Sequence, residues 1–364
     1  MKVGIFTFHC AHNYGAVLQA YALQEFLCSK GFEAYIIDYC PPYLIRPYNA
    51  LNLFDFSSRN FISFLRIFIS KLFLLPVAIK RSKAFNHFIR RYLKVTSLDL
   101  ASSNPDFDVF VFGSDQIWNP KICRGFDDVY FGKFKAAQGK GLISYAASMG
   151  TTVINEDGKE YLRWALADFS AVSVREYSLQ HFLSEWQDKS VKVVMDPTFL
   201  LDVKRWDKII QRTKIEGKYV LVYQVKTNPE TLRIANCIAR QIGGLVVELK
   251  AFLSLTHRSK YQCASPETFL SCIKYASCVV TTSFHGTAFS LIFNRPFYTI
   301  RLNADVDARS ESLLGKLDLL DRLLDSNVSP VFSEIDYQDV NLKRQRLTNE
   351  SERFLLEALE KFVS

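Results

Sequence analysis

The stretch Cys278-Val279-Val280-Thr281-Thr282-Ser283-Phe284-His285-Gly286-Thr287 decides the fold. It begins as a β-branched run, breaks at His285-Gly286, and continues as an apolar helical pattern that stops near Asn294. This pattern predicts a strand, a tight turn and a helix, with His285 at the carboxyl end of the strand. Ligands of open α/β sheets bind at that end, because a helix amino terminus offers N–H donors and a positive dipole to an anion. We therefore expect His285 to face an anionic small molecule.

The size and composition of the chain fit two globular domains. It has 364 residues, of which 49% are hydrophobic and 23% are charged, which is enough to form two cores. The eight cysteines form no C-x-x-C pair and no Cys/His spacing typical of zinc, so we expect reduced thiols in the cytoplasm and no metal site. A strand pattern starts at Lys2, so no secretory signal is expected.

Strand and helix patterns alternate through the first 200 residues and predict a parallel sheet. Polar residues follow each strand, as they do at the rim of an α/β ligand site. The expected strands, each with the polar stretch after it, are 2–8 with 9–15, 108–112 with 113–119, 141–145 with 146–150, 171–174 with 175–176, and 191–195 with 196–197. The first turn has neither G-x-G-x-x-G nor G-x-x-x-x-G-K-[ST], which argues against dinucleotide or P-loop nucleotide binding.

A second α/β pattern follows a connecting helix expected at 202–212. Its expected strands are 219–225, 245–249, 279–282 and 297–300, its helices are 229–241 and 266–275, and a charged amphipathic helix at 340–362 ends the chain. We therefore expect an α/β fold of two domains, the second smaller than the first. The expected parts are residues 1–200 with a basic-aromatic insertion at about 57–94, residues 213–330, and a helical tail at 331–364.

The insertion at 57–94 holds the basic excess of the chain. It has nine Lys or Arg residues and no acidic residue, whereas the whole chain has a net charge of +8. Its part 61–79 is nearly all apolar, but Arg66, Lys71 and Pro76 interrupt it, so a helix in the interface of an anionic membrane fits better than a span. The alternative is an amphipathic helix packed on the domain. Confinement of the charge to one apolar segment argues against nucleic-acid binding.

Five strings, in order between about Lys2 and Leu324, together resemble the polysaccharide pyruvyl transferases. They are HNYGAVLQ at 12–19, GSDQIW at 113–118, VSVRE at 172–176, MDPT at 195–198 and SFHGTAF at 283–289. Many members of that family have Arg two positions before the His, where this chain has Ser283. Recognition of phosphate or carboxylate then falls to other cations, and the candidates are Arg175, Arg301 and Arg309.

The resemblance implies two Rossmann-like domains facing a cleft, as in glycosyltransferases of the GT-B type. It implies transfer of pyruvate from phosphoenolpyruvate to two hydroxyls of a sugar, giving a cyclic ketal. The expected acceptor is a galactose-type residue on a polymeric or lipid-linked glycan, such as one carried on polyprenyl diphosphate. The resemblance implies no metal and no organic cofactor. The expected location is the cytoplasm, at the inner face of the plasma membrane.

The implied chemistry assigns roles to the polar residues. A histidine side chain titrates near neutrality, so His285 is expected to protonate the methylene of phosphoenolpyruvate. Asp115 is expected to take a proton from the acceptor hydroxyl, and Arg175 to bind the donor. The N–H groups of Gly286 and Thr287 are expected to face the donor anion. The other substrate-binding candidates are Asn13, Tyr14, Gly15, Ser114, Gln116, Trp118, Ser148, Ser283, Arg301 and Arg309.

These residues and the fold also allow other interpretations. His285 could be a turn histidine bonded to backbone, Arg175 a surface ion-pair residue, and Asp115 a helix cap. Asn13 could only shape the first turn, and Trp118 could be a packing anchor. At the level of function, the alternatives are a GT-B glycosyltransferase that uses a nucleotide sugar and a non-catalytic adaptor at a membrane surface.

Overall fold

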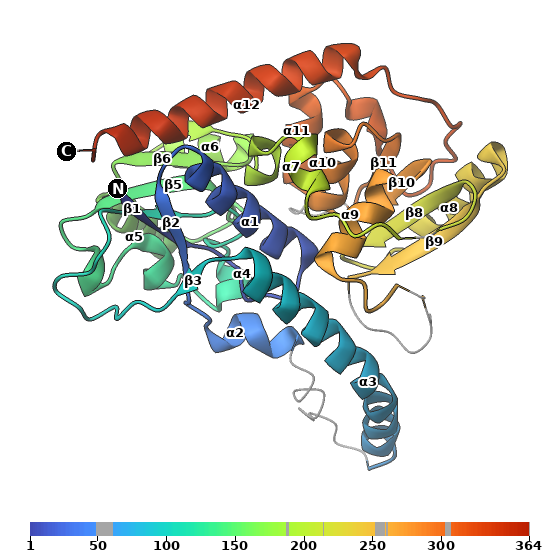
Figure 1. Cartoon of the computed structure of the whole chain (residues 1–364), viewed down its shortest axis with the longest axis horizontal. Coiled ribbons are helices and arrows are strands. Elements are labelled where there is room, and N and C mark those ends of the chain that lie inside the picture. Colours follow the sequence, from blue (N-terminus) through green and yellow to red (C-terminus); the bar gives the residue numbers. More distant parts are fainter. Residues whose placement is uncertain are drawn as a thin grey trace.

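Two parallel β-sheets, each flanked by helices, lie side by side in the molecule (Figure 1). The computed structural model describes residues 1–48, 61–186, 189–213, 215–251, 259, 261–302 and 307–363, and for 61–71 it describes only the helical backbone. All strand pairs given for these residues are parallel.

The first sheet has seven strands in the order β3-β2-β1-β4-β5-β6-β7. Its strands are β1 (Lys2–Phe6), β2 (Glu33–Ile37), β3 (Val95–Thr96), β4 (Val109–Phe112), β5 (Gly141–Ala147), β6 (Ala171–Val174) and β7 (Val191–Val193). Residues of β4 and β5 are buried throughout, because helices cover both faces of a parallel sheet.

The second sheet has five strands in the order β12-β11-β10-β8-β9. Its strands are β8 (Tyr219–Gln224), β9 (Leu245–Lys250), β10 (Cys278–Thr281), β11 (Phe297–Ile300) and β12 (Leu323–Leu324). Counted from β8, this is the doubly wound order 2-1-3-4-5.

The helices connect the strands and cover the sheets. They are α1 (Tyr14–Ser29), α2 (Pro42–Ile45), α3 (Phe61–Tyr92), α4 (Pro120–Cys123), α5 (Glu156–Leu166), α6 (Tyr177–Ser184), α7 (Val203–Asp207), α8 (Pro229–Ile242), α9 (Pro266–Lys274), α10 (Phe284–Ile292), α11 (Asp307–Lys316) and α12 (Tyr337–Glu360). The connecting helix expected at 202–212 was therefore predicted too long. It ends after α7, where Ile209 turns back into the core and donates its N–H to the Trp206 carbonyl.

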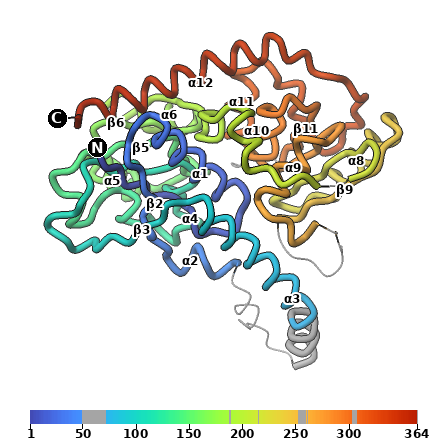
Figure 2. The backbone as a smooth tube through the Cα atoms, viewed as in Figure 1, coloured from blue at the N-terminus to red at the C-terminus, as the bar shows by residue number. Residues whose placement is uncertain are grey.

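An apolar core continues from the first sheet to the second. Tyr14 at the start of α1 stacks on Phe269 of α9 with a ring distance of 4.6 Å, and its hydroxyl donates to the Ala264 carbonyl at 2.9 Å. The tail helix α12 runs back from the second sheet to the first (Figures 1 and 2). On the way, its Ser351 hydroxyl accepts a hydrogen bond from the Met195 N–H at 2.9 Å. These contacts hold the two sheets in one arrangement.

The predicted fold class is confirmed: the chain forms two Rossmann-like α/β units in a GT-B-like arrangement. The insertion folds as α3, whose later part packs on the body of the molecule through Phe85 and Phe88, while the part nearer residue 71 extends from it (Figure 2). Among the described residues, no helix is long and apolar enough to cross a membrane. Residues 57–60 of the insertion lie outside the described part of the chain.

Candidate functional site

Both sheets reverse their strand order at points that face the same cavity. In the first sheet the order reverses between β1 and β4, and in the second between β8 and β10. Ligands of open α/β sheets bind outside the carboxyl ends of the strands at such a reversal. The residues that follow these four strands line a cavity of about 520 Å³: Phe8, Ala11 and Asn13; Asp115 and Gln116; Val225 and Lys226; and Thr282, Ser283, Phe284 and His285.

The charged lining of this cavity is mainly basic. Among the described lining residues, Asp115 is the one acidic side chain, and the Lys and Arg residues are Lys121, Arg124, Lys226 and Arg309. A wall with this balance favours an anionic ligand, because fixed positive charges in a partly enclosed space attract it strongly.

His285 lies where the two units meet. Its ring packs so closely on the amino terminus of α1 that a Cβ atom on Gly15 would lie 2.0 Å from His285 Nδ1. On its other side, Nε2 lies 3.6 Å from Asp196 Oδ2, and the side chain is 7% exposed. Nε2 is buried and has no hydrogen-bond partner among the described residues. The structure therefore places a ring nitrogen near a carboxylate at the cavity wall.

Asp196 connects this imidazole to the first sheet. Its Oδ2 accepts hydrogen bonds from Arg175 Nη1 at 2.7 Å and Ser114 Oγ at 3.2 Å, and its Oδ1 accepts from the N–H and hydroxyl of Thr198 at 3.0 and 2.8 Å. Burial alone would raise the pKa of Asp196, but the neighbouring His285 and Arg175 outweigh it and hold that pKa well below its usual range. The Asp196 carboxylate is therefore charged at neutral pH and favours a positive charge beside it.

Arg175 is not a surface ion-pair residue, because it is 3% exposed. Its Nη2 lies 3.6 Å from Asp115 Oδ1, and its guanidinium lies over the Phe284 ring at 4.7 Å. Asp115 adopts a φ of 74°, a left-handed backbone that Asp tolerates better than most residues, and its carboxylate accepts the Gln116 N–H at 2.9 Å. Asp115 is thus oriented between Arg175 and the cavity.

Arg309 supplies a cation from the second unit. Among the residues that the structure describes, none forms a hydrogen bond or an ion pair with its guanidinium, and its Nε is buried. Burial and the nearby charge of Arg175 lower the pKa of Arg309 to about 10, so it stays charged at neutral pH. Lys226 follows β8 on the opposite side of the same wall. These two side chains are the cations best placed for a ligand.

The expectation that the N–H groups of Gly286 and Thr287 face the donor is wrong. The Ser283 hydroxyl caps α10 and accepts the Gly286 N–H at 3.4 Å, and the Ser283 carbonyl accepts the Thr287 N–H at 3.1 Å. The Thr287 hydroxyl is paired with that of Thr299 at 2.6 Å. Ser283 itself lines the cavity. Its capping side chain, and not the two N–H groups, is therefore what α10 presents to a ligand at this position.

Four other candidates lie away from the cavity. Tyr14 is in the core between the units. Trp118 is 1% exposed and stacks on Phe131 with a ring distance of 5.4 Å, so it acts as the packing anchor of the alternative interpretation. The Ser148 hydroxyl donates to Glu176 Oε1 at 2.8 Å. Arg301 forms ion pairs with Glu311 and Asp325 and is not among the described lining residues.

The first turn has a structural and a lining role together. The Asn13 side chain accepts the Gly15 N–H at 2.9 Å and caps α1, and Asn13 also lines the cavity. Gln116 lines it too, and its Oε1 accepts a hydrogen bond from the Asn119 amide at 2.8 Å. The structure therefore brings Asn13, Gln116, Asp115, Ser283 and His285 to one wall.

Sequence reasoning missed Asp196 and Lys226 as site residues. Each follows the carboxyl end of a strand, β7 and β8, and that position was the available signal. Asp196 is joined to His285 only by tertiary packing across the two units, so no spacing along the chain could connect them.

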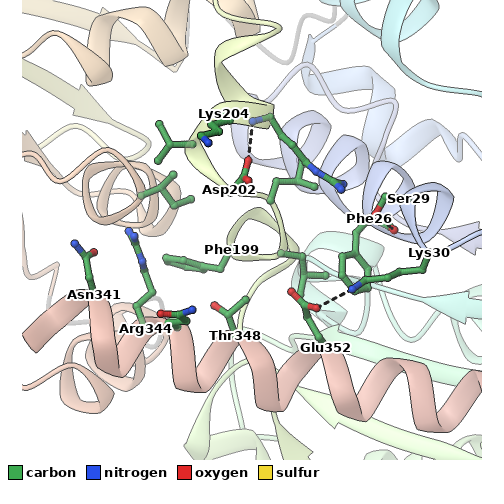
Figure 3. A pocket seen from close by; sticks show the side chains of 16 residues that line it. Phe26, Ser29, Lys30, Phe199, Asp202, Lys204, Asn341, Arg344, Thr348 and Glu352 are labelled. Atoms are coloured by element: carbon green, nitrogen blue, oxygen red, sulfur yellow. Dashed lines mark hydrogen bonds and ion pairs between the residues drawn. The ribbon is translucent and has the colours of Figure 1, made fainter.

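A second cavity, of about 630 Å³, lies between α1, α7 and α12 (Figure 3). Two of its four Lys and Arg residues are engaged by neighbours: Lys30 pairs with Glu352 at 3.1 Å, and Arg344 donates to the Leu291 carbonyl. None of the site residues predicted from the sequence lines it, so it does not compete with the cavity at His285.

The described side chains of α3 divide between packing and solvent. Arg81 is 5% exposed and donates to the Lys250 carbonyl at 2.9 Å and the Ala251 carbonyl at 2.9 Å, so this cation ties α3 to the second unit. Leu72 and Phe73 are 51% and 67% exposed. Part of α3 therefore packs on the domain, as the alternative interpretation expected. Another part carries exposed apolar side chains.

Comparisons with known proteins give one family and a set of similar folds. A search of curated proteins found no match. Among solved structures, a putative UDP-N-acetylglucosamine 2-epimerase from Listeria monocytogenes is 11% identical with a TM-score of 0.48, covering 98% of this chain and 91% of that one. A Streptomyces glycosyltransferase complexed with thymidine diphosphate is 12% identical with a TM-score of 0.45, covering 99% of each chain. The model of the polysaccharide pyruvyl transferase family matches residues 13–303, which include Arg175, Asp196 and His285, and the chain therefore belongs to that family.

Proposed function

We propose that this protein transfers pyruvate from phosphoenolpyruvate to two hydroxyls of a sugar, forming a cyclic ketal and releasing phosphate. The observation that supports this most is the meeting of His285, which follows β10 at the strand-order reversal of the second sheet, with Asp196 and Arg175 of the first unit. It provides a proton donor and a fixed positive charge beside the same carboxylate oxygen, Asp196 Oδ2, next to a basic cavity.

The donor carries a phosphate and a carboxylate, so its binding needs several cations. Arg309 and Lys226 line the cavity from the second unit, and Arg309 has no protein partner among the described residues. Arg175 Nη2 also has no hydrogen-bond partner there, although Nη1 is held by Asp196. Guanidinium groups bind phosphate and carboxylate oxygens in pairs, which favours Arg309 and Arg175 as the donor clamp.

The first chemical step is protonation of the donor methylene. His285, which lies beside Asp196, gives a proton from its imidazole to the methylene carbon, which becomes a methyl group. Positive charge then develops on the middle carbon. A sugar hydroxyl oxygen adds there and loses its proton to Asp115, which lines the cavity.

The second step closes the ketal. The C–O bond to phosphate breaks, phosphate leaves with the bonding pair, and a second hydroxyl of the same sugar adds to the same carbon. Its proton goes to the departing phosphate, and the proton held by Asp115 returns to His285 through solvent, so the enzyme regains its starting state and the atoms and charges of the reaction balance. Arg309, which lines the cavity, stabilises the negative charge on the leaving phosphate, and the buried Arg175, whose Nη2 has no hydrogen-bond partner among the described residues, adds to this positive charge.

The acceptor is proposed to be a galactose-type sugar on a polymeric or lipid-linked glycan. Asn13 and Gln116 line the cavity with amide groups, and Tyr43 and Tyr48 contribute aromatic rings to the same wall. Amides and aromatic rings are the groups that hold sugar hydroxyls and the apolar face of a sugar ring. Trp118 takes no part in this wall.

The test is a donor comparison. Purified protein is incubated with phosphoenolpyruvate and a panel of galactosides and hexosamine glycosides, and phosphate release is measured together with the product mass. The proposal predicts equal amounts of phosphate and pyruvate adduct. Nucleotide release from a sugar nucleotide, with no phosphate from phosphoenolpyruvate, would instead support a glycosyltransferase. A cell whose glycan is unchanged by His285→Ala would favour the non-catalytic adaptor.

We also propose that α3 attaches the enzyme to an anionic membrane surface at the inner face of the plasma membrane. Leu72, Phe73 and Ile79 are exposed apolar side chains on this helix, and Lys80 and Lys83 lie next to them in the sequence. Such a combination suits an interface in which apolar groups enter the lipid and cations meet the headgroups. This location would bring the site close to a lipid-linked acceptor.

A further inference from the structure

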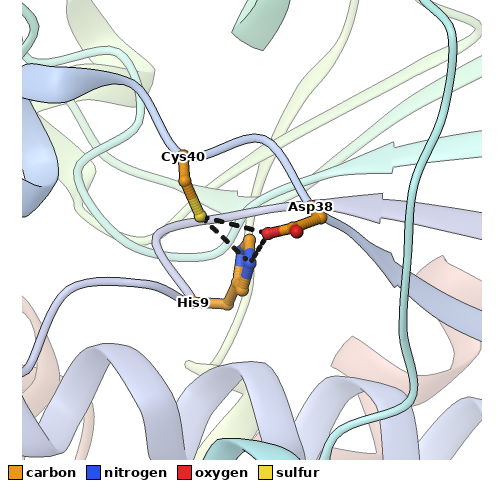
Figure 4. A group of neighbouring side chains, drawn as sticks. All are labelled: His9, Asp38 and Cys40. Carbon is orange, nitrogen blue, oxygen red and sulfur yellow. Dashed lines mark hydrogen bonds and ion pairs between the residues drawn. The ribbon is translucent and has the colours of Figure 1, made fainter. Parts of the chain in front are cut away.

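Three potential metal ligands meet beside the cavity, on the turns that follow β1 and β2. Figure 4 shows His9, Asp38 and Cys40 directed toward one another from these two turns. His9 Nε2 lies 3.3 Å from Asp38 Oδ1 and 3.5 Å from Cys40 Sγ, and Cys40 Sγ lies 3.2 Å from Asp38 Oδ1. Spacing along the sequence predicted no metal site, because only the pairing of β1 with β2 brings these residues together.

The three distances agree with a tetrahedral zinc site. Zinc bonds of about 2.0–2.3 Å place neighbouring ligand atoms roughly 3.4–3.6 Å apart at tetrahedral angles. The three observed separations, between 3.2 and 3.5 Å, lie within a few tenths of an ångström of those values. The ligand atoms therefore need only a small outward movement to surround an ion.

The other nitrogen of His9 is oriented as in a metal ligand. His9 Nδ1 lies 3.3 Å from the Thr7 carbonyl, which can only accept a hydrogen bond. A proton on Nδ1 leaves the lone pair of Nε2 directed toward Asp38 and Cys40. Histidine ligands of metals commonly donate their second N–H to a backbone carbonyl in this way. This contact is independent of the distances within the cluster.

We propose that His9, Asp38 and Cys40 form a binding site for a zinc-type divalent cation. A thiolate, an imidazole and a carboxylate together suit zinc better than magnesium or calcium, which prefer oxygen ligands. Cys10 is a hydrogen-bond neighbour of Cys40, so its thiol or a water molecule supplies the fourth ligand. Asp38 is 55% exposed at its side chain, which gives an ion access from solvent.

The site would fix the first turn of the chain. Phe8, Ala11 and Asn13 on this turn line the cavity, and the turn leads into the amino terminus of α1, where Gly15 packs on His285. A cation that joins His9 to Asp38 and Cys40 holds this turn against the turn after β2. Its role is structural, and the inference does not depend on the reaction proposed above.

Two other arrangements use the same residues. Without an ion, His9 and Asp38 form an ion pair: burial alone would lower the pKa of His9, but its hydrogen bonds to Asp38 and Cys40 raise it to about 9. Alternatively, Cys10 and Cys40 could oxidise to a disulfide, with loss of two electrons to an oxidant. The experiment has to separate these arrangements from a metal site.

The test measures retained zinc on the full chain under reducing conditions. Wild-type protein is stripped with a chelator, loaded with zinc, desalted and analysed for metal per chain. The variants are Cys40→Ser and Asp38→Asn, and the matched control is Cys28→Ser, a half-buried thiol on α1 outside the cluster. We expect about one zinc per chain in the wild type and the control, and affinity at least roughly a hundredfold weaker in the two variants.

Cobalt substitution and thermal unfolding complete the test. Cobalt bound by Cys40 gives a thiolate charge-transfer band, which Cys40→Ser should abolish and Cys28→Ser should keep. Zinc should raise the unfolding temperature of the wild type more than that of Asp38→Asn, whose exposed side chain makes misfolding a minor concern. Equal zinc retention in the wild type and Cys40→Ser would overturn the proposal. So would a Cys10–Cys40 disulfide found by peptide mapping with no zinc bound after reduction.

Discussion

The two sides of the cavity differ in the charges that they bring to it. The first unit supplies both carboxylates, Asp115 in the described lining and Asp196 behind it, with Arg175 held between them, and it adds the cations Lys121 and Arg124 to the lining. The second unit supplies only bases to the described lining, namely His285, Lys226 and Arg309. A carboxylate that is buried in one unit therefore faces an imidazole from the other. The comparison teaches that neither unit contains the reaction site alone, and that the contact between Asp196 and His285 joins the two halves.

Removing the imidazole should produce the largest loss. His285→Ala takes away the proton donor of the second unit, and turnover should fall by roughly a hundredfold to ten-thousandfold, the range for a positioned acid or base. The measurement is the initial rate of phosphate release, with thermal unfolding to show that the fold is kept. The control is His181→Gln, an exposed histidine on α6, which should retain the wild-type rate. Near wild-type turnover in His285→Ala would exclude this residue from the chemistry.

Removing the negative charge of Asp196 should lower the stability of the first unit. Asp196→Asn removes the nearer of the two carboxylates that face the buried Arg175 and should cost about 3 kcal/mol of stability at pH 7. The pKa of Asp196 is held below its usual range, so the stability from its carboxylate is present above about pH 4 and is lost as pH falls below that value.

The difference in the free energy of unfolding between the wild type and Asp196→Asn should therefore become smaller when unfolding is measured from pH 7 to pH 3. The control is Asp157→Asn, an exposed residue of α5. A difference that stays constant across this range would show that the carboxylate is not stabilised by the neighbouring positive charges.

A methyl group added at Gly15 in the first unit should displace the imidazole of His285 in the second unit. In Gly15→Ala the added Cβ would lie 2.0 Å from His285 Nδ1, so the imidazole has to move. A misplacement of about 1 Å can reduce turnover by roughly a hundredfold. The control is Gly315→Ala, where an added Cβ meets no atom within 4 Å. Rates that are equal in the two variants would contradict the contact between α1 and His285.

Loss of the unpaired arginine should affect substrate binding more than stability. Arg309→Gln removes a cation that has no protein partner among the described residues, so the fold should be unaffected. A charged hydrogen bond contributes about 1.5–3 kcal/mol, which predicts a roughly tenfold to hundredfold lower kcat/KM for phosphoenolpyruvate. Arg301→Gln, which removes a residue paired with Glu311, should leave kcat/KM unchanged. The opposite ranking of these two variants would refute the assignment of the donor clamp.

The smallest effect is expected for substitutions on α3, outside the cavity, and it concerns membrane binding. The double substitution of Leu72 and Phe73 by Ser should reduce binding to phosphatidylserine vesicles severalfold, because both side chains are exposed on α3. Binding of the wild type should also weaken as salt rises, since the headgroup attraction is screened. Val153→Ser changes an even more exposed apolar residue away from α3 and should have no effect. Equal binding to neutral and anionic vesicles would exclude the electrostatic contribution.

The sequence predicted the fold well because its signals are local. The β-branched run before His285 and the apolar helix after it appear in the structure as β10 and α10, with Ser283 as the cap. Polar residues after strands predicted the rim of the site, since parallel strands end at the same edge of a sheet. The alternation of strands and helices was enough to predict both sheets.

The remaining features depend on contacts between distant parts of the chain. Asp196 is a site residue only because tertiary packing places it beside His285. Arg301 and Trp118 each lie shortly after a strand, where the sequence suggested a site residue. In the structure, however, Arg301 forms an ion pair with Glu311, and Trp118 packs in the core against Phe131. The Gly286 N–H was expected to meet the ligand, but the preceding cap accepts it first. Residue type and position in a turn do not specify these partners.

The most direct test of the account is the mass of the product formed from phosphoenolpyruvate and a galactoside. With the wild-type protein, we expect a cyclic pyruvate adduct and one phosphate released per adduct, and with His285→Ala we expect both to fall together. Phosphoenolpyruvate left unchanged with every acceptor, while the same protein releases a nucleotide from a sugar nucleotide, would contradict the account.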